Sequence, residues 1–189
     1  MLNVAIVVGS TRPGNRAGAV ARWIHETASR RADATWEIVD LGDFELPLLD
    51  EPIPAAVDDY RHEHTKRWAA KMATFDAYVF VTPEYNHSTS GALKNAIDFL
   101  YAEWVNKAAG FVSYGYDGGT RAVEHLRLVL GGLQVADVAA QVALTIHGDY
   151  VDETELRPRE HQYAAAGSML DQVVAWGAAL RSLRLGDEL

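Results

Sequence analysis

Five polar residues lie between the first apolar segment of the chain and a segment with helical spacing: Ser10, Thr11, Arg12, Asn15 and Arg16. Their hydroxyl and amide groups can donate hydrogen bonds, and the two guanidinium groups carry full charges in a forked geometry. The N-terminus of a helix adds unpaired N–H groups and a partial positive charge. Together these features predict that the loop binds an anion, and phosphate has the right chemistry.

Three known kinds of phosphate-binding loop share features with this segment. The spacing of Gly9 and Gly14 begins like a Walker A loop, but Asn15 and Arg16 replace the lysine and the serine or threonine of that loop. A Rossmann dinucleotide loop needs a central glycine that GSTRPG lacks, although Asp40 could serve as its ribose-binding acid. The mixture of hydroxyls and arginines favours the third kind, an anchor for a terminal, doubly charged phosphate. An ordinary solvated turn is the alternative without a ligand.

Two further loops combine aromatic, polar and glycine residues, and each follows a predicted strand. They read PEYNHSTSGALKNAIDFL at 83–100 and SYGYDGGTRAVEHLR at 113–127. A flat heteroaromatic ring needs packing on a face and backbone hydrogen bonds along its rim. We expect the packing from three tyrosines, Tyr85, Tyr114 and Tyr116, and the close backbone approach from three glycines, Gly115, Gly118 and Gly119.

Strand and helix patterns alternate along the whole chain. Short apolar segments predict strands at 3–9, 35–41, 77–83, 108–115 and 142–146, the last of which could begin near Val138. Apolar residues at helical spacing predict helices at 15–31, 57–74, 89–104, 119–132 and 159–184. This alternation predicts an α/β fold, a single domain over 1–189 with helices on both faces of a parallel sheet. Ligands of such folds bind beyond the carboxyl ends of the strands, so the three loops should meet at one edge.

The composition narrows the class of protein. A net charge of −9 disfavours nucleic-acid binding, which needs a surplus of lysine and arginine. No segment of about 18 consecutive apolar residues is present, so we expect no membrane-spanning helix. The absence of cysteine removes disulfides, thiolate nucleophiles and cysteine-based metal sites, and it is compatible with a cytoplasmic location.

Three segments, GSTRPGNR, PEYNHSTSGALKNAIDFL and SYG…GG.RA..HLR, make the chain resemble the NAD(P)H-dependent FMN reductase family of flavodoxin-like proteins. That family includes quinone and chromate reductases. The resemblance covers residues 3 to 145 and is most specific in the second segment. It implies a flavodoxin-like three-layer sandwich whose five-stranded parallel sheet has the order 2-1-3-4-5.

The resemblance also assigns a part of FMN to each loop. The first loop would hold the phosphate, the second would line the ribityl chain and the isoalloxazine, and the third would close the other side of the ring. The implied residues are Ser10, Thr11, Arg12, Asn15 and Arg16, then Pro83, Glu84, Tyr85 and Asn86, then Ser113, Tyr114, Gly115, Gly118 and Gly119. Departures from the family pattern at His87 and in YDGG lie near the ring and bear on the choice of substrate.

The implied activity is hydride transfer from NADH or NADPH to bound FMN, followed by transfer to a small-molecule acceptor. A quinone, a free flavin or a metal oxyanion could be that acceptor. Such chemistry needs no metal ion and no side chain as nucleophile or base. Backbone N–H groups of the loop 113–119 would stabilise the reduced ring near N1 and O2. Two alternatives stay open: an FMN-binding electron carrier without NAD(P)H activity, and an NAD-binding dehydrogenase that uses Asp40.

The helix predicted at 89–104 carries apolar residues nearly all round: Leu93, Ile97, Phe99, Leu100, Tyr101 and Trp104. A helix that is apolar on more than one face needs more than one surface to pack against, and the resemblance implies that this helix packs against a second subunit. We therefore predict a homodimer, or a tetramer made of two dimers, in which Glu103 and Trp104 reach the neighbouring site. Lys94 and Asp98 are spaced for an ordinary surface ion pair.

Features outside the three loops carry less functional signal. His62 and His64 should point apart on their helix and lie in solvent, which disfavours a shared metal ion. His125 is expected at the surface or at a helix cap, whereas His87 could contact the substrate or a partner subunit. The acidic loop 42–59 is long for a compact domain, and we interpret it as a lid that borders the nicotinamide site.

Overall fold

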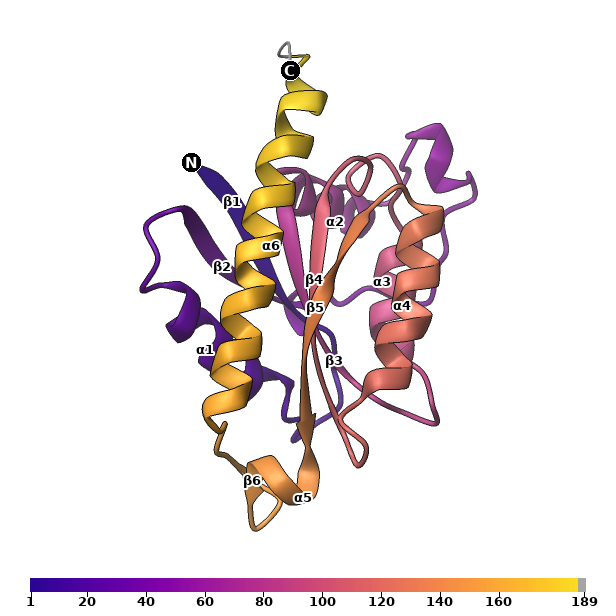
Figure 1. Cartoon of the computed structure of the whole chain (residues 1–189). Coiled ribbons are helices and arrows are strands. Elements are labelled where there is room, and N and C mark those ends of the chain that lie inside the picture. The colour runs from indigo at the N-terminus through magenta and orange to yellow at the C-terminus, as the bar shows by residue number, and fades with distance from the viewer. Residues whose placement is uncertain (187–189) are drawn as a thin grey trace.

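A parallel sheet of five strands forms the middle layer of the computed structural model, which describes residues 1–186 (Figure 1). The strands are β1 (Leu2–Val8), β2 (Ala34–Asp40), β3 (Ala77–Pro83), β4 (Ala108–Gly115) and β5 (Ala136–Thr145). Their spatial order is β2-β1-β3-β4-β5, which confirms the predicted order 2-1-3-4-5. The last three residues of the domain predicted over 1–189 lie outside the described part.

The inner strands of the sheet are buried on both faces. Every residue of β3 is buried, and only Asn3 of β1 is exposed. Such strands are typical of a parallel sheet that helices cover on both sides, and they explain the near-continuous apolar segments in the sequence. Gly110 of β4 lets the last helix approach the sheet closely, because a Cβ there would lie 2.8 Å from Val173 Cγ2.

Helices cover the two faces of the sheet in two groups (Figure 1). One face packs against α1 (Ala17–Ala28) and α6 (Glu160–Leu185). The other face packs against α2 (Glu63–Ala73), α3 (Gly91–Asp98) and α4 (Thr120–Gly132). None of the helices in residues 1–186 is both long and apolar enough to cross a membrane.

The polar loops follow β1, β3 and β4, which are neighbours in the sheet. The chain runs from β1 outward to β2 and then crosses to β3 on the other side of β1. The order of the strands therefore reverses between β1 and β3, and this is where ligands of such sheets bind. The Gly9 N–H donates to Val81 O at 2.8 Å, which joins the first loop to the end of β3.

Three predicted helices are shorter in the structure, and two of them begin later because side chains of the preceding loops bind the backbone there. Asn15 Oδ1 accepts the Ala17 N–H at 2.9 Å, so α1 begins at residue 17 instead of 15. The N–H groups of Arg61 and His62 donate to the Glu51 carboxylate, at 2.9 and 3.0 Å, so α2 begins at residue 63 instead of 57. The third, α3, covers only 91–98 of the predicted 89–104.

The apolar residues of the segment 89–104 face the core of this chain, so the prediction that they require a second subunit is wrong in its reasoning. Leu93, Ile97, Phe99, Leu100 and Trp104 are all at most 1% exposed. The chain turns after α3 ends at Asp98, and this turn carries the later apolar residues into the core. Trp104 therefore cannot reach a neighbouring site, whereas the predicted surface pair of Lys94 and Asp98 is confirmed at 2.6 Å.

The long loop after β2 is fixed against α3. The loop holds two short 3-10 turns, η1 (Leu41–Phe44) and η2 (Ala55–Val57), and Asn95 of α3 fixes it by contacts to Pro47 O and the Leu49 N–H, at 2.7 and 2.9 Å.

His62 and His64 do not point apart. His62 precedes α2 in an extended conformation, and the two rings stack with centroids 5.2 Å apart. Both rings are half-buried and contact Asp50, whose Oδ1 lies 3.0 Å from His64 Nε2.

The chain after β5 forms a small unit that the sequence analysis did not predict. It consists of α5 (Ile146–Asp149) and an antiparallel hairpin of β6 (Tyr150–Val151) and β7 (Glu155–Leu156). This unit lies beyond the carboxyl end of β5 (Figure 1). β5 itself begins at Ala136, earlier than the predicted 142 or 138, and its pairing with β4 is irregular between Ala109 and Phe111.

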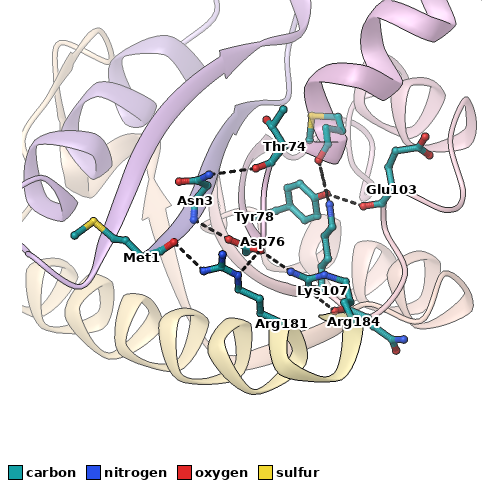
Figure 2. A network of polar contacts seen from close by, with 11 residues as sticks. Met1, Asn3, Thr74, Asp76, Tyr78, Glu103, Lys107, Arg181 and Arg184 are labelled. Carbon is teal, nitrogen blue, oxygen red and sulfur yellow. Dashed lines mark hydrogen bonds and ion pairs between the residues drawn. The ribbon is translucent and has the colours of Figure 1, made fainter. Parts of the chain in front are cut away.

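A buried polar network lies at the opposite, amino-terminal edge of the sheet (Figure 2). Lys107 is 5% exposed, and its Nζ lies 2.9 Å from the Tyr78 hydroxyl. Asp76 accepts the Asn3 N–H at 3.0 Å and pairs with Arg184 of α6 at 2.6 Å. This network ties the last helix to the start of β3, far along the strands from the polar loops.

Candidate functional site

The three predicted loops meet around one cavity of about 350 Å³ at the carboxyl edge of the sheet. The first loop and the start of α1 contribute most of its lining, and one tyrosine comes from each of the other two loops. The lining residues are Arg12, Gly14, Asn15, Arg16, Ala19, Tyr85, Tyr114 and Thr154. The structure thus brings together residues that are separated by up to about 140 positions in the sequence, as the strand order predicts.

In the first loop, some of the predicted residues have side chains without partners among residues 1–186, and others form hydrogen bonds that shape the loop. Ser10 is buried, and its Oγ lies 3.2 Å from the Tyr85 hydroxyl. Arg12 is exposed beside the cavity, and its guanidinium forms no hydrogen bond with any residue in 1–186. Thr11 instead lines a neighbouring hollow of about 320 Å³ beside Gly42 and Asn95.

Asn15 has a structural role that the sequence analysis did not assign. Its Nδ2 donates to Arg12 O and its Oδ1 accepts the Ala17 N–H, both at 2.9 Å. Its amide is therefore occupied in shaping the turn just before α1, since an asparagine side chain commonly bonds to the backbone two residues on. Gly9 is also structural, because a Cβ there would lie 2.6 Å from Val81 O.

The second loop is a tight turn that presents Tyr85 to the cavity. Tyr85 and Ser88 exchange both backbone hydrogen bonds, at 2.9 and 3.1 Å, around Asn86 and His87. Both central residues have positive φ, at 50° and 66°, which is typical of a two-residue hairpin turn. His87 is thus exposed at the tip of this turn, and His125 lies at the surface with its Nδ1 2.9 Å from Ser88 Oγ.

Glu84 contacts a residue that the sequence analysis did not place in the site. Its carboxylate accepts the guanidinium of Arg121 at 2.8 Å and the Arg121 N–H at 3.1 Å, and the Glu84 N–H donates to Tyr114 O at 2.9 Å. The Glu84 side chain is 9% exposed, so Arg121 neutralises a nearly buried charge. The sequence signal that could have placed Arg121 in the site was its position just after two glycines at the start of a helix.

The third loop is held together by its own hydrogen bond and by close packing. Ser113 Oγ donates to Gly118 O at 2.7 Å and is completely buried, so it shapes the loop instead of facing a ligand. Gly119 has a φ of 73°, and a Cβ there would lie 2.8 Å from the Tyr114 N atom. No other residue fits at this position without moving β4.

Tyr114 and Tyr116 differ from what the sequence analysis predicted. Tyr116 is 70% exposed and lies beside His147, so it does not line the cavity. Tyr114 lines the cavity but is only 5% exposed, and its hydroxyl has no hydrogen-bond partner in the described chain. Burial raises the pKa of Tyr114, which keeps the hydroxyl protonated. A buried hydroxyl without a partner, on a residue that lines a cavity, is a donor that a ligand oxygen can satisfy.

The hairpin after β5 closes the remaining side of the cavity. Thr154 lines it, and the guanidinium of Arg16 donates to Glu153 O in the turn of the hairpin, with Nε at 2.7 Å. Nothing in the sequence around 150–156 indicated this contact, because it joins residues that are 137 positions apart.

This geometry places two arginines at a cavity beside the start of α1, and comparison with known proteins shows the family of the chain. A family model described as NADPH-dependent FMN reductase matches residues 2–149, which include all three loops. The chain belongs to this family. The resemblance seen in the sequence is therefore confirmed, and with it the prediction of an FMN-dependent oxidoreductase that uses NAD(P)H.

Individual relatives and structures agree with this membership. An NAD(P)H-dependent FMN reductase of Schizosaccharomyces pombe is 38% identical over 157 residues, which cover 82% of this chain and 78% of the relative. An NAD(P)H-dependent FMN reductase of Saccharomyces cerevisiae is 38% identical over 156 residues, which cover 77% and 81%. The flavoenzyme NAD(P)H:(acceptor) oxidoreductase FerB from Paracoccus denitrificans has a TM-score of 0.74 at 22% identity, covering 95% of this chain and 98% of its own. This last likeness confirms the flavodoxin-like fold.

The residues around the cavity fit the FMN of the family. Arg12, Arg16 and the start of α1 offer positive charge and N–H donors for a phosphate group. The unpaired Tyr114 hydroxyl and the Ser10 hydroxyl offer further donors beside them. The dinucleotide alternative lacks comparable support, since Asp40, its candidate ribose-binding acid, accepts the Gly42 N–H at 2.9 Å.

Proposed function

We propose that this protein binds FMN in the cavity between its three loops and transfers electrons from NADH or NADPH to a small-molecule acceptor such as a quinone. The observation that carries the proposal is the pairing of two arginines at the start of α1 with the unpaired, buried hydroxyl of Tyr114. When bound, FMN supplies the hydride and electron chemistry itself. The residues of the chain therefore bind, orient and shield it.

The proposed roles of the site residues follow from their contacts. Arg12 and Arg16 bind the phosphate, with Ser10 and Tyr114 donating beside them, while Thr11 borders the site from the neighbouring hollow. Asn15 shapes the first loop. In the second and third loops, the residues that hold the turns beside the ring are Pro83, Glu84, Tyr85, Asn86, Ser113, Gly115, Gly118 and Gly119. Glu84 is paired with Arg121, so its proposed role is to hold the second and third loops together.

The quinone reductase of Pseudomonas putida supports a quinone as the acceptor, since it is 40% identical over 116 residues, which cover 59% of each chain. The alternative is an FMN-binding electron carrier, which would hold flavin but oxidise NAD(P)H negligibly. A free flavin or a metal oxyanion are the other acceptors that the proposal includes.

A spectrum and a turnover measurement test this function. The purified protein mixed with FMN should show a shifted flavin absorption band, and it should oxidise NADH or NADPH when a quinone is added. In Arg12→Ala the affinity for FMN should fall by about tenfold or more, since a charge-assisted contact contributes roughly 1.5–3 kcal/mol. Arg30→Ala, which removes an exposed arginine beyond the other end of α1, is the control. Flavin binding without turnover over several quinones would favour the electron carrier.

We also propose that the protein is a homodimer, or a tetramer made of two dimers, that uses the outward side of the segment 89–104. The support is an apolar groove of about 470 Å³ between α3 and α4. Leu128, which borders this groove, is 78% exposed. A single domain over 1–189 and a cytoplasmic location stay predictions, as does the role of the loop 42–59 as a lid.

A further inference from the structure

Arg16 is held in place before any ligand binds, unlike Arg12. Its Nε and Nη2 atoms both donate to the single carbonyl oxygen of Glu153, and the Nε distance is 2.7 Å. Its Nη1 atom forms no hydrogen bond with the residues that the structure describes. One edge of the guanidinium is therefore occupied, and Nη1 remains as a donor on a residue that lines the cavity.

The ring of Tyr150 holds the same guanidinium from its flat side. Arg16 Cζ lies 5.5 Å from the centroid of that ring, within the range of a cation–π contact. Tyr150 is 7% exposed, and its hydroxyl has no partner within residues 1–186. The hydroxyl therefore does not fix the ring in place through a protein contact, and the ring face is the part of Tyr150 that contacts Arg16.

The hairpin that supplies these contacts is itself anchored. Asp149, just before Tyr150, is 1% exposed and accepts the Thr145 N–H at 2.7 Å and Gln162 Nε2 at 2.7 Å. Arg159 pairs with the same carboxylate at 2.8 Å. These contacts join the base of the hairpin to the end of β5 and the start of α6, so the Glu153 carbonyl is a fixed acceptor.

We propose that Tyr150 is a positioning residue, which together with the Glu153 carbonyl holds Arg16 so that Nη1 is directed to the flavin phosphate. This inference rests on the proposed function, because it assumes that the phosphate lies in the first loop. The hairpin lies beyond residues 2–149, which match the family model. A guanidinium that is already ordered loses less side-chain entropy when it binds.

The consequence is a preference for phosphorylated over unphosphorylated flavin. If Tyr150 acts through Arg16, removing its ring weakens binding of FMN but not of riboflavin, which has no phosphate. The ratio of the two dissociation constants therefore isolates this role from a general loss of structure.

The test is a titration of both flavins, followed by quenching of flavin fluorescence, on the full chain and its variants. In Tyr150→Leu the preference for FMN over riboflavin should fall about tenfold, as expected for the loss of a partly buried cation–π contact. Tyr150→Phe keeps the ring, and Glu153→Gly keeps the backbone carbonyl and the positive φ of 56°. Both variants should retain the wild-type preference.

Two outcomes would overturn the inference. The first is an unchanged preference in Tyr150→Leu, including the case in which both flavins weaken equally, which would show a purely structural role. If Tyr150→Leu does not fold, Arg16→Lys gives the answer, because it keeps the charge but loses the fork and the stacking. If Arg16→Lys keeps the wild-type preference for FMN, the fixed orientation of the Arg16 guanidinium does not contribute to phosphate binding.

Arg12→Ala and Arg16→Ala in the same assay separate this inference from the proposed function. If neither variant changes the preference for FMN, the phosphate does not lie in the first loop, and both proposals are wrong. If Arg16→Ala lowers the preference but Tyr150→Leu does not, the phosphate site stands and only the role of Tyr150 is refuted.

Discussion

Several polar side chains at the carboxyl edge of the sheet form hydrogen bonds with other groups of the protein. Asn15 accepts the Ala17 N–H at the start of α1, Ser113 donates to Gly118 O, and Glu84 pairs with Arg121. Buried polar groups need partners, and a loop that must keep its shape without a ligand provides them internally. Three residues of the cavity lining keep a donor that is unused within residues 1–186, namely Arg12, Arg16 at its Nη1, and Tyr114, and they are therefore the strongest candidates for direct contact with FMN.

The contact of Arg121 with Glu84 gives a prediction at the scale of single residues. Arg121→Ala leaves the nearly buried Glu84 carboxylate without its cation, so the free energy of unfolding should fall by about 1–2 kcal/mol. Flavin affinity should fall with it, because Glu84 joins the second and third loops. Denaturant unfolding and a flavin titration measure both effects. Asp117→Ala removes a 67% exposed partner of the same arginine and should change neither. Equal behaviour of the two variants would contradict the prediction.

At the scale of the element, α3 shows how a one-dimensional pattern misleads. The apolar residues of 89–104 would surround a single helix, but α3 ends at Asp98 and the following turns fold back into the core. Trp104 Nε1 donates to Ile97 O at 3.0 Å, so even its polar atom is satisfied within the chain. The pattern that suggested two packing surfaces reflects two short segments with one core between them.

This burial predicts what substitution of Trp104 does. Trp104→Ala should lower the free energy of unfolding by about 3–5 kcal/mol, because it leaves a cavity in the core. The measurement is chemical unfolding followed by circular dichroism. Ala102→Glu, at an exposed position in the same turns, is the control and should be close to neutral. A change in oligomeric mass without loss of stability in Trp104→Ala would instead restore the interface role.

The whole molecule should respond to pH through Lys107. Burial, and then the nearby Arg184, lower the pKa of Lys107 from 10.5 to about 8, with Asp76 opposing them (Figure 2). Between pH 8 and 10.5 the unfolded chain holds a proton that the folded protein has released, so stability rises with pH in this window. Burial raises the pKa of Tyr78, so above pH 10 the opposite effect begins.

The measurement is the free energy of unfolding in urea at several pH values between 7 and 9.5. The contribution of Lys107 over that range should be a gain of about 2 kcal/mol in the wild type. The stability of Lys107→Met should depend less on pH and be higher near pH 7, because the variant no longer buries an amine that is charged in most of the molecules at that pH. The same slope in both proteins would show that Lys107 keeps an ordinary pKa.

The oligomeric state provides a second prediction at the scale of the molecule. Leu128→Glu places a charge beside the groove between α3 and α4 and should lower the mass measured by light scattering to that of a monomer. Leu48→Glu is the matched control, since Leu48 is 85% exposed on the loop 42–59. An unchanged mass for Leu128→Glu would show that the groove is not the interface.

The sequence by itself determined the parallel sheet and the edge at which the three loops meet, whereas the strand order came from the family resemblance. The sheet and this edge follow from local properties, since apolar β-branched segments form buried strands, and right-handed crossovers bring the loops of neighbouring strands together. The first loop could likewise be interpreted locally, because Ser10, Arg12 and Arg16 stand next to a helix start. The segments at 83–100 and 113–127 added the family and its cofactor.

Only the tertiary structure decided which side chains line the cavity and which hold the loops. Glu84 meets Arg121 across 37 positions, and Arg16 meets Glu153 across 137. Such partners are set by the packing of whole elements, which leaves no periodic signal in either segment. For the same reason, the sequence did not predict the packing of Trp104 or the hairpin beside Arg16. Hydrophobic patterning indicates that a residue is buried, but not which residues it packs against.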